Sequence, residues 1–513
     1  MFSHLRSATT YGIGAHILDI ETNVDPGIFN FTIVGLPDNA VRESRERVGA
    51  AIKNAGLTLP PRRFTVNLAP ADMRKEGAAF DLPIALGLLA ATGQIHDSEL
   101  RQALILGELS LDGALRPVRG VLSIALEARR RGLKRLVVPR NNADEAGLVH
   151  EIDVIGVDHL KGVIEWLDGR LRIEPTIVDR ARLFNHQDSQ SVDLSEVKGQ
   201  ENVKRAFEVA AAGGHNLLMV GPPGSGKTMI ARRLPTLLPE MSFDEALETT
   251  RIHSVAGVLP RGTPLITQRP FRSPHHTISD AALVGGGMGV PRPGEISLAH
   301  HGVLFLDEMP EFARNVLEVL RQPLEERAIT IARSRTSLVF PANFQLVASM
   351  NPCPCGNLGN PNAECSCTPQ QVQRYMARIS GPLLDRIDIH IEVSAVRYRE
   401  LSARRQAESS KVVRNRVVTA RDVQRRRFTG HEGLFKNADM GSRHIAEWCR
   451  LTTDGSEILR IAMQKLGFSA RAYDRILKLS RTVADLAGSR DIGPEHLSEA
   501  IQYRSLDRQF WSV

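Results

Sequence analysis

Apolar residues in the first third of the chain recur with the periods of strands and helices. Short apolar or alternating runs predict strands at Phe31–Val34, Phe64–Leu68 and Leu133–Val138. Asn39–Asn54 repeats apolar residues at helical spacing, and Leu82–Thr92 predicts a more apolar helix. The apolar positions near one face of the first helix are Val41, Val48, Ala51 and Ile52. This mixture predicts an α/β domain.

The same patterns continue through the middle of the chain. Short apolar runs predict buried strands at Asn216–Val220, His301–Leu306 and Asn343–Met350. Ala328–Phe340 holds two β-rich arms around a short polar centre, as a hairpin does. The Gly- and Pro-rich segment 249–301 is long for a plain connection, which indicates a functional insert.

The C-terminal part of the chain has helical patterns. Arg404–Arg427 is rich in Lys and Arg and places Val413 and Val417 at helical spacing. Its basic side chains form either a solvated face or a contact to DNA. Asp439–Leu506 predicts a helical lid, in which Pro494 suits the first turn of a late helix.

These elements divide the chain into three domains. Residues 1–172 are expected to form the first α/β domain, and residues 173–192, which are poor in apolar side chains, a linker. An α/β core is expected over residues 193–395, followed by a helical region over 396–513. A chain of 513 residues accommodates three domains of ordinary size.

The composition is that of a globular protein, with 42% hydrophobic and 24% charged residues. No apolar run reaches the length of about 18 residues that a transmembrane helix needs, and Met1–Arg6 lacks the apolar core of a signal peptide. We therefore expect a cytoplasmic protein without membrane contact. The net charge of +7 is compatible with a polyanionic partner, and also with an ordinary soluble protein.

A Gly-rich loop lies between the strand at Asn216–Val220 and a helix that starts near Met229. It matches the P-loop pattern G-x-x-x-x-G-K-[ST], whose backbone N–H groups cradle phosphates. Lys227 would reach the β- and γ-phosphates, and the Thr228 hydroxyl would ligate Mg²⁺. The predicted nucleotide-binding residues are Gly221, Pro222, Pro223, Gly224, Ser225, Gly226, Lys227 and Thr228.

The apolar strand at His301–Leu306 ends in two carboxylates, Asp307 and Glu308. Downstream of a P-loop, an apolar strand followed by Asp-Glu is a Walker B pattern. Asp307 is expected to hold Mg²⁺, and Glu308 to position and polarise the attacking water. The loop and the carboxylates together predict an ATP hydrolase that uses ATP and Mg²⁺.

Motifs outside these two sites resemble a known family. Arg269–Thr277, Pro293–Gly302 and Gly381–Asp388 look like the Mg-chelatase-like AAA+ ATPases. Val66–Asp81 and Gly107–Pro117 resemble the proteolytic domain of the Lon family and its inactive relatives. Together they resemble the YifB/ComM branch over essentially the whole chain. The resemblance implies a Lon-like domain with the ribosomal-protein-S5-like fold, a P-loop AAA+ α/β core with a helix-2 insert, and a C-terminal α-helical lid.

The resemblance to AAA+ proteins also assigns roles to three polar residues. Asn351 would be sensor 1, which contacts the γ-phosphate, with a plain turn as the alternative. A neighbouring subunit would present Arg386 to the γ-phosphate, and the alternative is an internal ion pair with Asp385 or Asp388. Arg471 would be the sensor 2 arginine, acting either in its own subunit or in the next.

Resemblance to Lon does not imply proteolysis. The Lon serine would fall near Ala79, and its lysine partner near Leu122 or Ile124. Without a hydroxyl and an amine at these positions, Ser–Lys chemistry is impossible. We expect a structural or partner-binding platform instead.

Four cysteines cluster between Asn351 and Arg386 as C-x-C, nine intervening residues and a second C-x-C. Four thiolates so close together in a cytosolic chain predict a structural Zn²⁺. The C-x-C spacing is tighter than usual, so a redox disulfide pair and free thiols remain alternatives. The pair His300–His301 lacks helical ligand spacing and is not expected to bind metal. The predicted zinc ligands are Cys353, Cys355, Cys365 and Cys367.

Resemblance to ComM implies a homo-hexameric ring that hydrolyses ATP and moves on single-stranded or branched DNA. Its activity would be branch migration, which widens the joint formed when transforming DNA invades the chromosome, with recombination proteins as candidate partners. Arg333 and Arg335 at the hairpin tip would follow the phosphate backbone, and the alternative is a solvated tip. The rival function is a chaperone-like ring that remodels a protein or drives metal insertion, as Mg-chelatase motors do.

Overall fold

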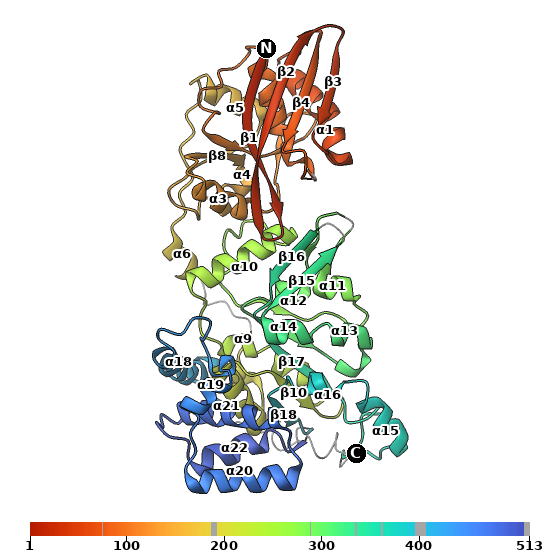
Figure 1. Ribbon diagram of the computed structural model, residues 1–513, viewed down its shortest axis with the longest axis vertical. Helices are drawn as coiled ribbons and strands as arrows, with labels where there is room; N and C mark the ends of the chain where they lie inside the picture. Colours follow the sequence, from red (N-terminus) through yellow and green to blue (C-terminus); the bar gives the residue numbers. More distant parts are fainter. Residues whose placement is uncertain are drawn as a thin grey trace.

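Three parts follow one another along the longest axis of the molecule: the N-terminal domain at one end, the α/β core of residues 193–395, named the motor for its expected activity, in the middle, and the helical C-terminal region, named the lid, at the other end (Figure 1). This computed structural model describes residues 1–73, 75–185, 192–287, 289–333, 336–360, 363–395 and 407–506. In the described part of the chain, no helix has both the length and the apolar character needed to cross a membrane.

A seven-stranded mixed sheet organises the N-terminal domain. In spatial order its strands are β3 (Asn30–Val34), β4 (Arg62–Ala69), β2 (Gly14–Pro26), β1 (Phe2–Tyr11), β5 (Ala103–Ile105), β8 (Arg135–Pro139) and β9 (Asp153–Val157). Strands β1, β2 and β4 are antiparallel neighbours, whereas β5, β8 and β9 run parallel. The predicted strands near residues 31, 64 and 133 are confirmed as β3, β4 and β8.

Helices cover this sheet, and the first one begins and ends where its apolar spacing predicts. Asp38 accepts the backbone N–H of Val41 at 2.8 Å and so caps the amino end of α1. A short strand pair, β6 (Glu108–Leu109) and β7 (Leu115–Arg116), lies beside the main sheet. The helices are α1 (Asn39–Asn54), α2 (Asp81–Ala91), α3 (Val121–Arg130), α4 (Arg140–Ala146) and α5 (Leu160–Leu167).

The predicted linker contains a short helix, α6 (Arg180–Asn185), at the junction with the motor. The Arg180 guanidinium lies 4.3 Å from the ring centroid of Phe243, and Leu183 packs against an apolar cluster shared by both domains. Through these contacts the segment packs against the two domains, which its low apolar content did not predict. Residues 186–191 lie outside the described part of the chain.

A five-stranded parallel sheet forms the centre of the motor. Its strands, in spatial order, are β11 (Phe271–Arg272), β14 (Val303–Leu306), β17 (Gln345–Met350), β10 (Leu217–Val220) and β18 (Ile389–Glu392). The surrounding helices include α7 (Glu201–Gly213), α8 (Lys227–Ala231), α9 (Leu234–Leu237), α10 (Phe243–Ala256), α13 (Arg314–Glu318), α14 (Arg321–Glu326), α15 (Pro369–Met376) and α16 (Gly381–Leu384). The parallel sheet with flanking helices is the α/β core that the sequence predicts.

Between α10 and β14 the insert forms short elements rather than one long loop: α11 (Asp280–Val284), β12 (Gly285–Gly286), β13 (Arg292–Pro293) and α12 (Glu295–Leu298). The predicted hairpin is confirmed as antiparallel β15 (Ala328–Arg333) and β16 (Thr336–Pro341). It projects from the motor toward the turn between β1 and β2 (Figure 1). Arg335 lies outside the described residues, and the Arg333 side chain is likewise not described.

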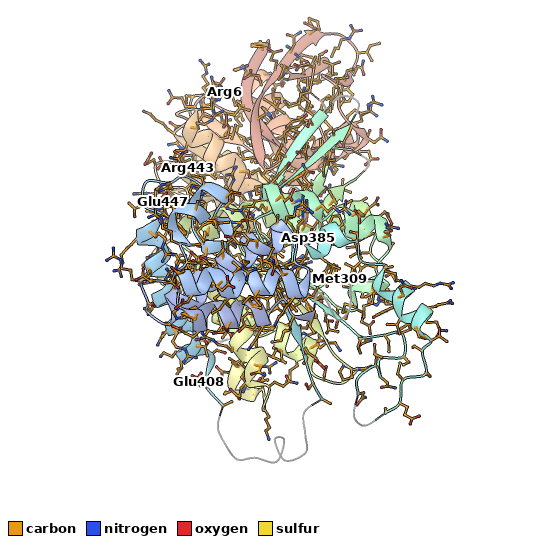
Figure 2. All side chains as sticks on the ribbon, turned by 60° about the horizontal axis from the view of Figure 1, so that its bottom comes forward. Arg6, Met309, Asp385, Glu408, Arg443 and Glu447 are labelled. Atoms are coloured by element: carbon orange, nitrogen blue, oxygen red, sulfur yellow. The ribbon has the colours of Figure 1, made fainter. Side chains whose placement is uncertain are left out.

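The C-terminal region is helical, as predicted. Its helices are α18 (Ser410–Arg427), α19 (Ser442–Trp448), α20 (Thr453–Leu466), α21 (Ala470–Leu486) and α22 (Pro494–Gln502), which begins at the predicted proline. Seen from the lower end of Figure 1, these helices lie in front of the motor, with Arg443 and Glu447 on α19 (Figure 2).

Most cations of α18 are engaged within the protein. Arg416, Arg425 and Arg427 form ion pairs, and Arg421 donates to the Ala211 carbonyl at 2.8 Å. This arrangement favours a structural and solvated basic face over a surface for DNA.

Candidate active site

The predicted phosphate-binding loop joins the carboxyl end of β10 to the start of α8. Gly224 and Gly226 have left-handed φ angles of 74° and 85°, which glycine adopts without strain, so the backbone can curl around a ligand. The Lys227 ammonium donates to the carbonyls of Gly221 at 2.7 Å and Pro222 at 2.9 Å. Burial lowers the pKa of Lys227. The Lys227 ammonium thus folds back onto carbonyl groups of its own loop. A bound phosphate can take the place of these carbonyls as the partner of the ammonium.

Two hydroxyl groups hold the Asp307 carboxylate at the end of β14. Thr228 Oγ1 donates to Asp307 Oδ2 at 2.6 Å, and Ser349 Oγ donates to Asp307 Oδ1. Ser349 was not predicted; its only signal is a polar residue near the carboxyl end of a buried strand. A carboxylate beside a hydroxyl offers the oxygen ligands that Mg²⁺ accepts, with waters in its other positions.

Glu308 lies next to this pair in a strained backbone conformation. Its φ of 51° is left-handed, and strain of this kind gathers at functional sites. The Glu308 N–H contacts Asp307 Oδ1 at 3.2 Å and Ser349 Oγ at 3.3 Å. Its side chain is exposed and makes no ion pair with the described residues, so the carboxylate is free to meet water.

Asn351 completes the group from the strand next to β10. Its Oδ1 accepts a hydrogen bond from Lys227 Nζ at 3.2 Å. The structure therefore brings together five predicted residues at the carboxyl edge of the parallel sheet, where α/β proteins bind ligands: Lys227, Thr228, Asp307, Glu308 and Asn351.

This group fits a magnesium–nucleotide complex. The Ser225 hydroxyl is buried in the loop without a hydrogen-bond partner among the described residues, which is rare for a buried polar group and suits a loop that receives phosphate oxygens. Lys227, Thr228 and Asp307 would hold the nucleotide and its metal. Bound Mg²⁺ would polarise the phosphate oxygens as a Lewis acid.

Arg386 and Arg471 lie at the amino ends of the parallel strands, opposite the P-loop. Asn216, which precedes β10, donates to the Arg386 carbonyl at 3.0 Å, whereas the P-loop follows β10 at its other end. A strand of this length separates the two ends by about 13 Å. Arg471 is largely exposed and lies 3.7 Å from Asp385. Neither arginine belongs to the cluster around its own P-loop.

The Arg386 guanidinium has partners that differ from the predicted alternatives. It pairs with Glu325 of α14 rather than with Asp385 or Asp388, and it donates to the Pro382 carbonyl at 2.5 Å. Because Glu325 is itself exposed, this pair can open without breaking the core.

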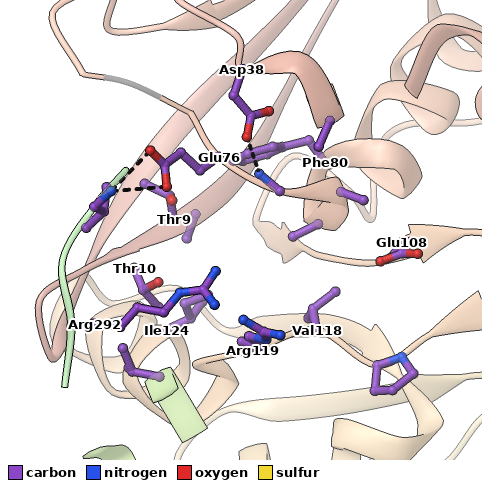
Figure 3. A pocket seen from close by; sticks show the side chains of 18 of the residues that line it. Thr9, Thr10, Asp38, Glu76, Phe80, Glu108, Val118, Arg119, Ile124 and Arg292 are labelled. Atoms are coloured by element: carbon purple, nitrogen blue, oxygen red, sulfur yellow. Dashed lines mark hydrogen bonds between the residues drawn. The ribbon is translucent and has the colours of Figure 1, made fainter. Parts of the chain in front are cut away.

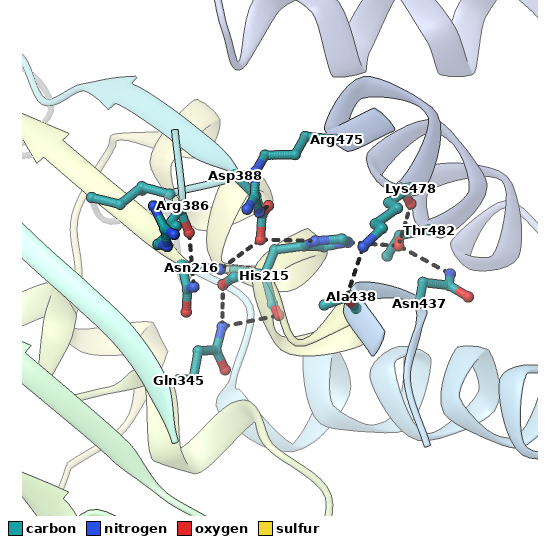
Figure 4. Close-up of polar contacts among 12 residues, drawn as sticks. His215, Asn216, Gln345, Arg386, Asp388, Asn437, Ala438, Arg475, Lys478 and Thr482 are labelled. Carbon is teal, nitrogen blue, oxygen red and sulfur yellow. Dashed lines mark hydrogen bonds and ion pairs between the residues drawn. The ribbon is translucent and has the colours of Figure 1, made fainter. Parts of the chain in front are cut away.

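A buried polar network joins this edge of the sheet to the lid (Figure 4). Asp388 accepts the Asn216 N–H at 3.1 Å, pairs with Arg475 of α21 and lies 3.4 Å from His215 Nδ1. Burial opposes the charge of Asp388, but Arg475 and His215 hold its pKa well below the usual range. Arg475 lies one helical turn after Arg471, so the network fixes the lid helix that carries Arg471.

The four clustered cysteines bring their sulfur atoms together. Cys353 Sγ lies 3.3 Å from Cys355 and 3.6 Å from Cys365, and all four sulfurs lie within 4.8 Å of one another, Cys367 included. The edges of a ZnS₄ tetrahedron measure about 3.8 Å, given Zn–S bonds of about 2.3 Å. All four are free thiols in this structure, which does not support the disulfide alternative. The donor set therefore fits Zn²⁺.

The first cysteine knuckle rests on the P-loop. Gly356, one residue after Cys355, has a φ of 80°, and a Cβ there would lie 2.5 Å from Pro223 Cδ. Cys353 is buried two residues after Asn351. The cluster is thus placed to hold both Asn351 and the start of the P-loop.

A second group of candidate ligands, Glu248, His300 and His301, lies near the amino end of β14. His300 Nδ1 accepts the Asn343 N–H at 3.0 Å, so its Nε2 carries the proton that faces Glu248 at 3.2 Å. A neutral imidazole used in this way has no lone pair left for a metal. His301 Nε2 lies 2.9 Å from the same carboxylate, so the group is a polar cluster around Glu248.

Three family models match the chain. They are described as magnesium chelatase, subunit ChlI, over residues 193–401; subunit ChlI of Mg-chelatase, over 20–142; and magnesium chelatase, subunit ChlI C-terminal, over 407–504. A shorter similarity joins the chain to Lon protease homolog 2, peroxisomal, of Caenorhabditis elegans, which is 29% identical over 169 residues, 31% of this chain and 21% of that protein.

Two bacterial relatives match almost end to end. YifB of Escherichia coli K12 is 45% identical over 509 residues, which cover 98% of this chain and 97% of the relative. Competence protein ComM of Haemophilus influenzae is 45% identical over 506 residues, with the same two coverages of 98% and 97%. The chain therefore belongs to the YifB/ComM family of Mg-chelatase-like AAA+ ATPases.

Proposed function

We propose that the protein is an ATP-driven motor that assembles as a hexameric ring on DNA and drives branch migration. The observation that supports a ring is the division of the ATP site. Lys227, Asp307 and Asn351 lie at the carboxyl ends of the parallel strands, whereas Arg386 lies at their amino ends. An arginine used in trans completes a site only when subunits meet side by side. A closed ring of such contacts completes every site.

DNA as the track is supported by the chain's relatives and its charge. A relative that matches nearly the whole chain is named competence protein ComM, which favours a role in transformation. The net charge of +7 suits a polyanion. In a ring, the β15–β16 hairpin would carry Arg333 and Arg335 to the channel, where cations follow phosphates without reading bases.

Each residue of the divided site has a task in the proposed hydrolysis. Thr228 and Asp307 would hold Mg²⁺, and Lys227 would neutralise the phosphates. Glu308 would orient the attacking water and accept its proton. Arg386 of the next subunit would neutralise charge that develops in the transition state. Arg471, beside Asp385 at the same edge, would join that subunit's contribution.

Arg386→Ala is expected to lower ATP hydrolysis roughly 10³- to 10⁵-fold, the range for an arginine finger, and to leave nucleotide binding intact. Mixing it with Lys227→Ala protomers should restore part of the activity, because mixed rings contain intact P-loops beside intact arginines. Phosphate release measures both. Arg378→Ala, which removes another motor arginine paired with Glu311 at 2.8 Å, is the matched control. Failure of the mixture to recover would contradict a role in trans.

Arg333→Ala combined with Arg335→Ala is expected to retain basal ATP hydrolysis and to lose its stimulation by DNA. Removing two cations per subunit weakens backbone contacts without touching the nucleotide site. ATPase and translocation assays measure the loss. Arg425→Ala with Arg426→Ala removes the same charge from α18 and should leave stimulation unchanged. Unaltered DNA binding and translocation in the hairpin variant would mean that the hairpin arginines do not contact DNA.

The proposed function as a whole is tested by ATPase rates with single-stranded, duplex and forked DNA at two salt concentrations, with Lys227→Ala as the blank. Stimulation that fades as salt rises is expected, because phosphate contacts release counterions. A robust rate that is indifferent to every DNA would favour the second candidate, a ring that remodels a protein or drives metal insertion. The match to magnesium chelatase models over residues 193–401 and 407–504 favours that candidate.

We further propose that the N-terminal domain is a non-proteolytic Lon-like platform with the ribosomal-protein-S5-like fold. The partial similarity to a Lon homolog supports this origin. The resemblance places the Lon serine near Ala79 and its lysine partner near Leu122 or Ile124, and the side chains of Ala79 and Ile124 line one cavity. Neither side chain can act as a nucleophile or a base.

A further inference from the structure

A cavity of about 540 Å³ lies where the N-terminal domain meets the motor insert (Figure 3). The N-terminal domain contributes Thr10 and Ile124 to its wall, and the motor contributes Val290 and Arg292. Small-molecule sites commonly have volumes of roughly 300–1,000 Å³. The cavity is therefore large enough for a ligand of nucleotide size, and it is separate from the P-loop.

Two guanidinium groups point toward each other in this cavity, one from each domain (Figure 3). Arg119 precedes α3, and Arg292 belongs to β13 of the insert. Within the described part of the chain, neither forms an ion pair or a side-chain hydrogen bond. Burial, followed by the charge of Arg292, lowers the pKa of Arg119. An anion between them would relieve this repulsion.

The carboxylates that line the same cavity already have other partners. Asp38 caps α1, and Glu76 accepts the Val290 N–H at 3.2 Å. Glu108 lies 3.7 Å from Arg116. The hydrogen bonds leave Asp38 and Glu76 charged, but in the described part of the chain no carboxylate pairs with Arg119 or Arg292, so an anionic ligand is favoured between the two guanidinium groups.

Close packing between the domains sets the position of Arg119. A Cβ at Gly257, which ends α10, would lie 2.5 Å from Arg119 Nε. A Cβ at Gly120 would lie 2.2 Å from Thr10 Cγ2, and the Gly120 N–H donates to Ser254 Oγ of the motor at 2.9 Å. Both positions have left-handed φ angles, of 76° at Gly257 and 72° at Gly120, which favour glycine. The Arg119 side chain is exposed, but its backbone is held in the junction between the domains.

We propose that this cavity binds a phosphate ester of nucleotide size. Arg119 and Arg292 would hold the phosphate, since guanidinium groups donate paired hydrogen bonds to phosphate oxygens. Val118 and Val290, which are half-buried, would pack against the apolar part of the ligand. Because the two arginines come from different domains, the bound ligand would tie the N-terminal domain to the motor.

The test uses the full chain with Lys227→Ala, which silences the P-loop, and calorimetric titration with AMP, pyrophosphate and adenosine. AMP also lacks the β- and γ-phosphates that a P-loop grips. AMP and pyrophosphate are expected to bind, and adenosine at least tenfold more weakly. Adding Arg119→Gln and Arg292→Gln should weaken both phosphate probes at least tenfold. Arg63→Gln, at an exposed position of β4, is the matched control, and thermal melting checks that each variant folds.

Two results would overturn the proposal. One is no binding of AMP or pyrophosphate, and the other is equal affinity in the double-arginine variant. If a single-stranded oligonucleotide bound through these arginines while AMP did not, the site would belong to DNA and the small-ligand assignment would be wrong. None of these outcomes depends on whether DNA stimulates ATP hydrolysis, so the proposed motor function is judged separately.

Discussion

Glu308→Gln is expected to slow ATP hydrolysis strongly while ATP still binds. General bases contribute roughly 10²- to 10⁴-fold to rates, and glutamine cannot accept the proton of the attacking water. The change keeps the size of the side chain and the backbone contacts of residue 308 to Asp307 and Ser349. Phosphate release should therefore fall by that factor, whereas equilibrium binding of a fluorescent ATP analogue should stay near the wild-type value.

Two comparisons make this result specific. Glu326→Gln makes the same chemical change on α14, where the side chain accepts a hydrogen bond from Gln322 at 2.8 Å, and it should hydrolyse ATP at the wild-type rate. Lys227→Ala should lose binding as well, because its ammonium is the buried cation of the loop. A wild-type rate in Glu308→Gln would mean that another group activates the water.

The nucleotide site was open to prediction because its signals are local. The P-loop is a run of consecutive residues, and Asp307 follows a strand of uninterrupted apolar residues. Parallel strands end at one edge of a sheet, so residues that follow different strands meet there. The contact between Lys227 and Asn351, 124 residues apart, follows from that rule alone.

Strands that contain buried polar residues could not be predicted from the apolar pattern in this way. Strands β1 and β2 are long, but Ser3 and Ser7 occupy buried positions of β1 and break the apolar alternation. Each hydroxyl donates to a backbone carbonyl at 2.8 Å, of Gly87 and Ile105 respectively, which makes its burial tolerable. Because these partners are distant in sequence, no local pattern predicts the hydrogen bonds.

Residues that act between elements were hidden for the same reason. Glu325 as the partner of Arg386, and the network that links Asp388 to Arg475, depend on helices that meet only in the folded chain. The facing arginines of the domain junction are a further example, because Arg119 and Arg292 lie in unrelated segments of the sequence. Physical reasoning on local patterns finds strands, helices and motifs, but not these pairings.

Loss of the cysteine cluster is expected to disable the nucleotide site, although no cysteine touches the P-loop lysine. The purified chain should contain about one Zn²⁺ per subunit, held by the thiolates of Cys353, Cys355, Cys365 and Cys367. Cys365→Ser with Cys367→Ser should lose the metal, which frees the knuckle at Gly356 from Pro223 and leaves Asn351 poorly placed. A shift of about 1 Å in a positioned group can lower a rate by about 10²-fold, and we expect ATP hydrolysis to fall by that order.

Metal analysis by mass spectrometry and phosphate release, made on the same samples, decide the matter. Cys449→Ala is the matched control, because it removes a buried cysteine outside the cluster and should keep both zinc and activity. Cysteine thiols must be deprotonated to hold the metal. Zinc should therefore also be released, and activity lost, as the pH falls and the thiolates are protonated. Full ATP hydrolysis in a zinc-free chain would show that the knuckle holds its place on the P-loop through packing alone, and the cluster would then have no part in ATP turnover.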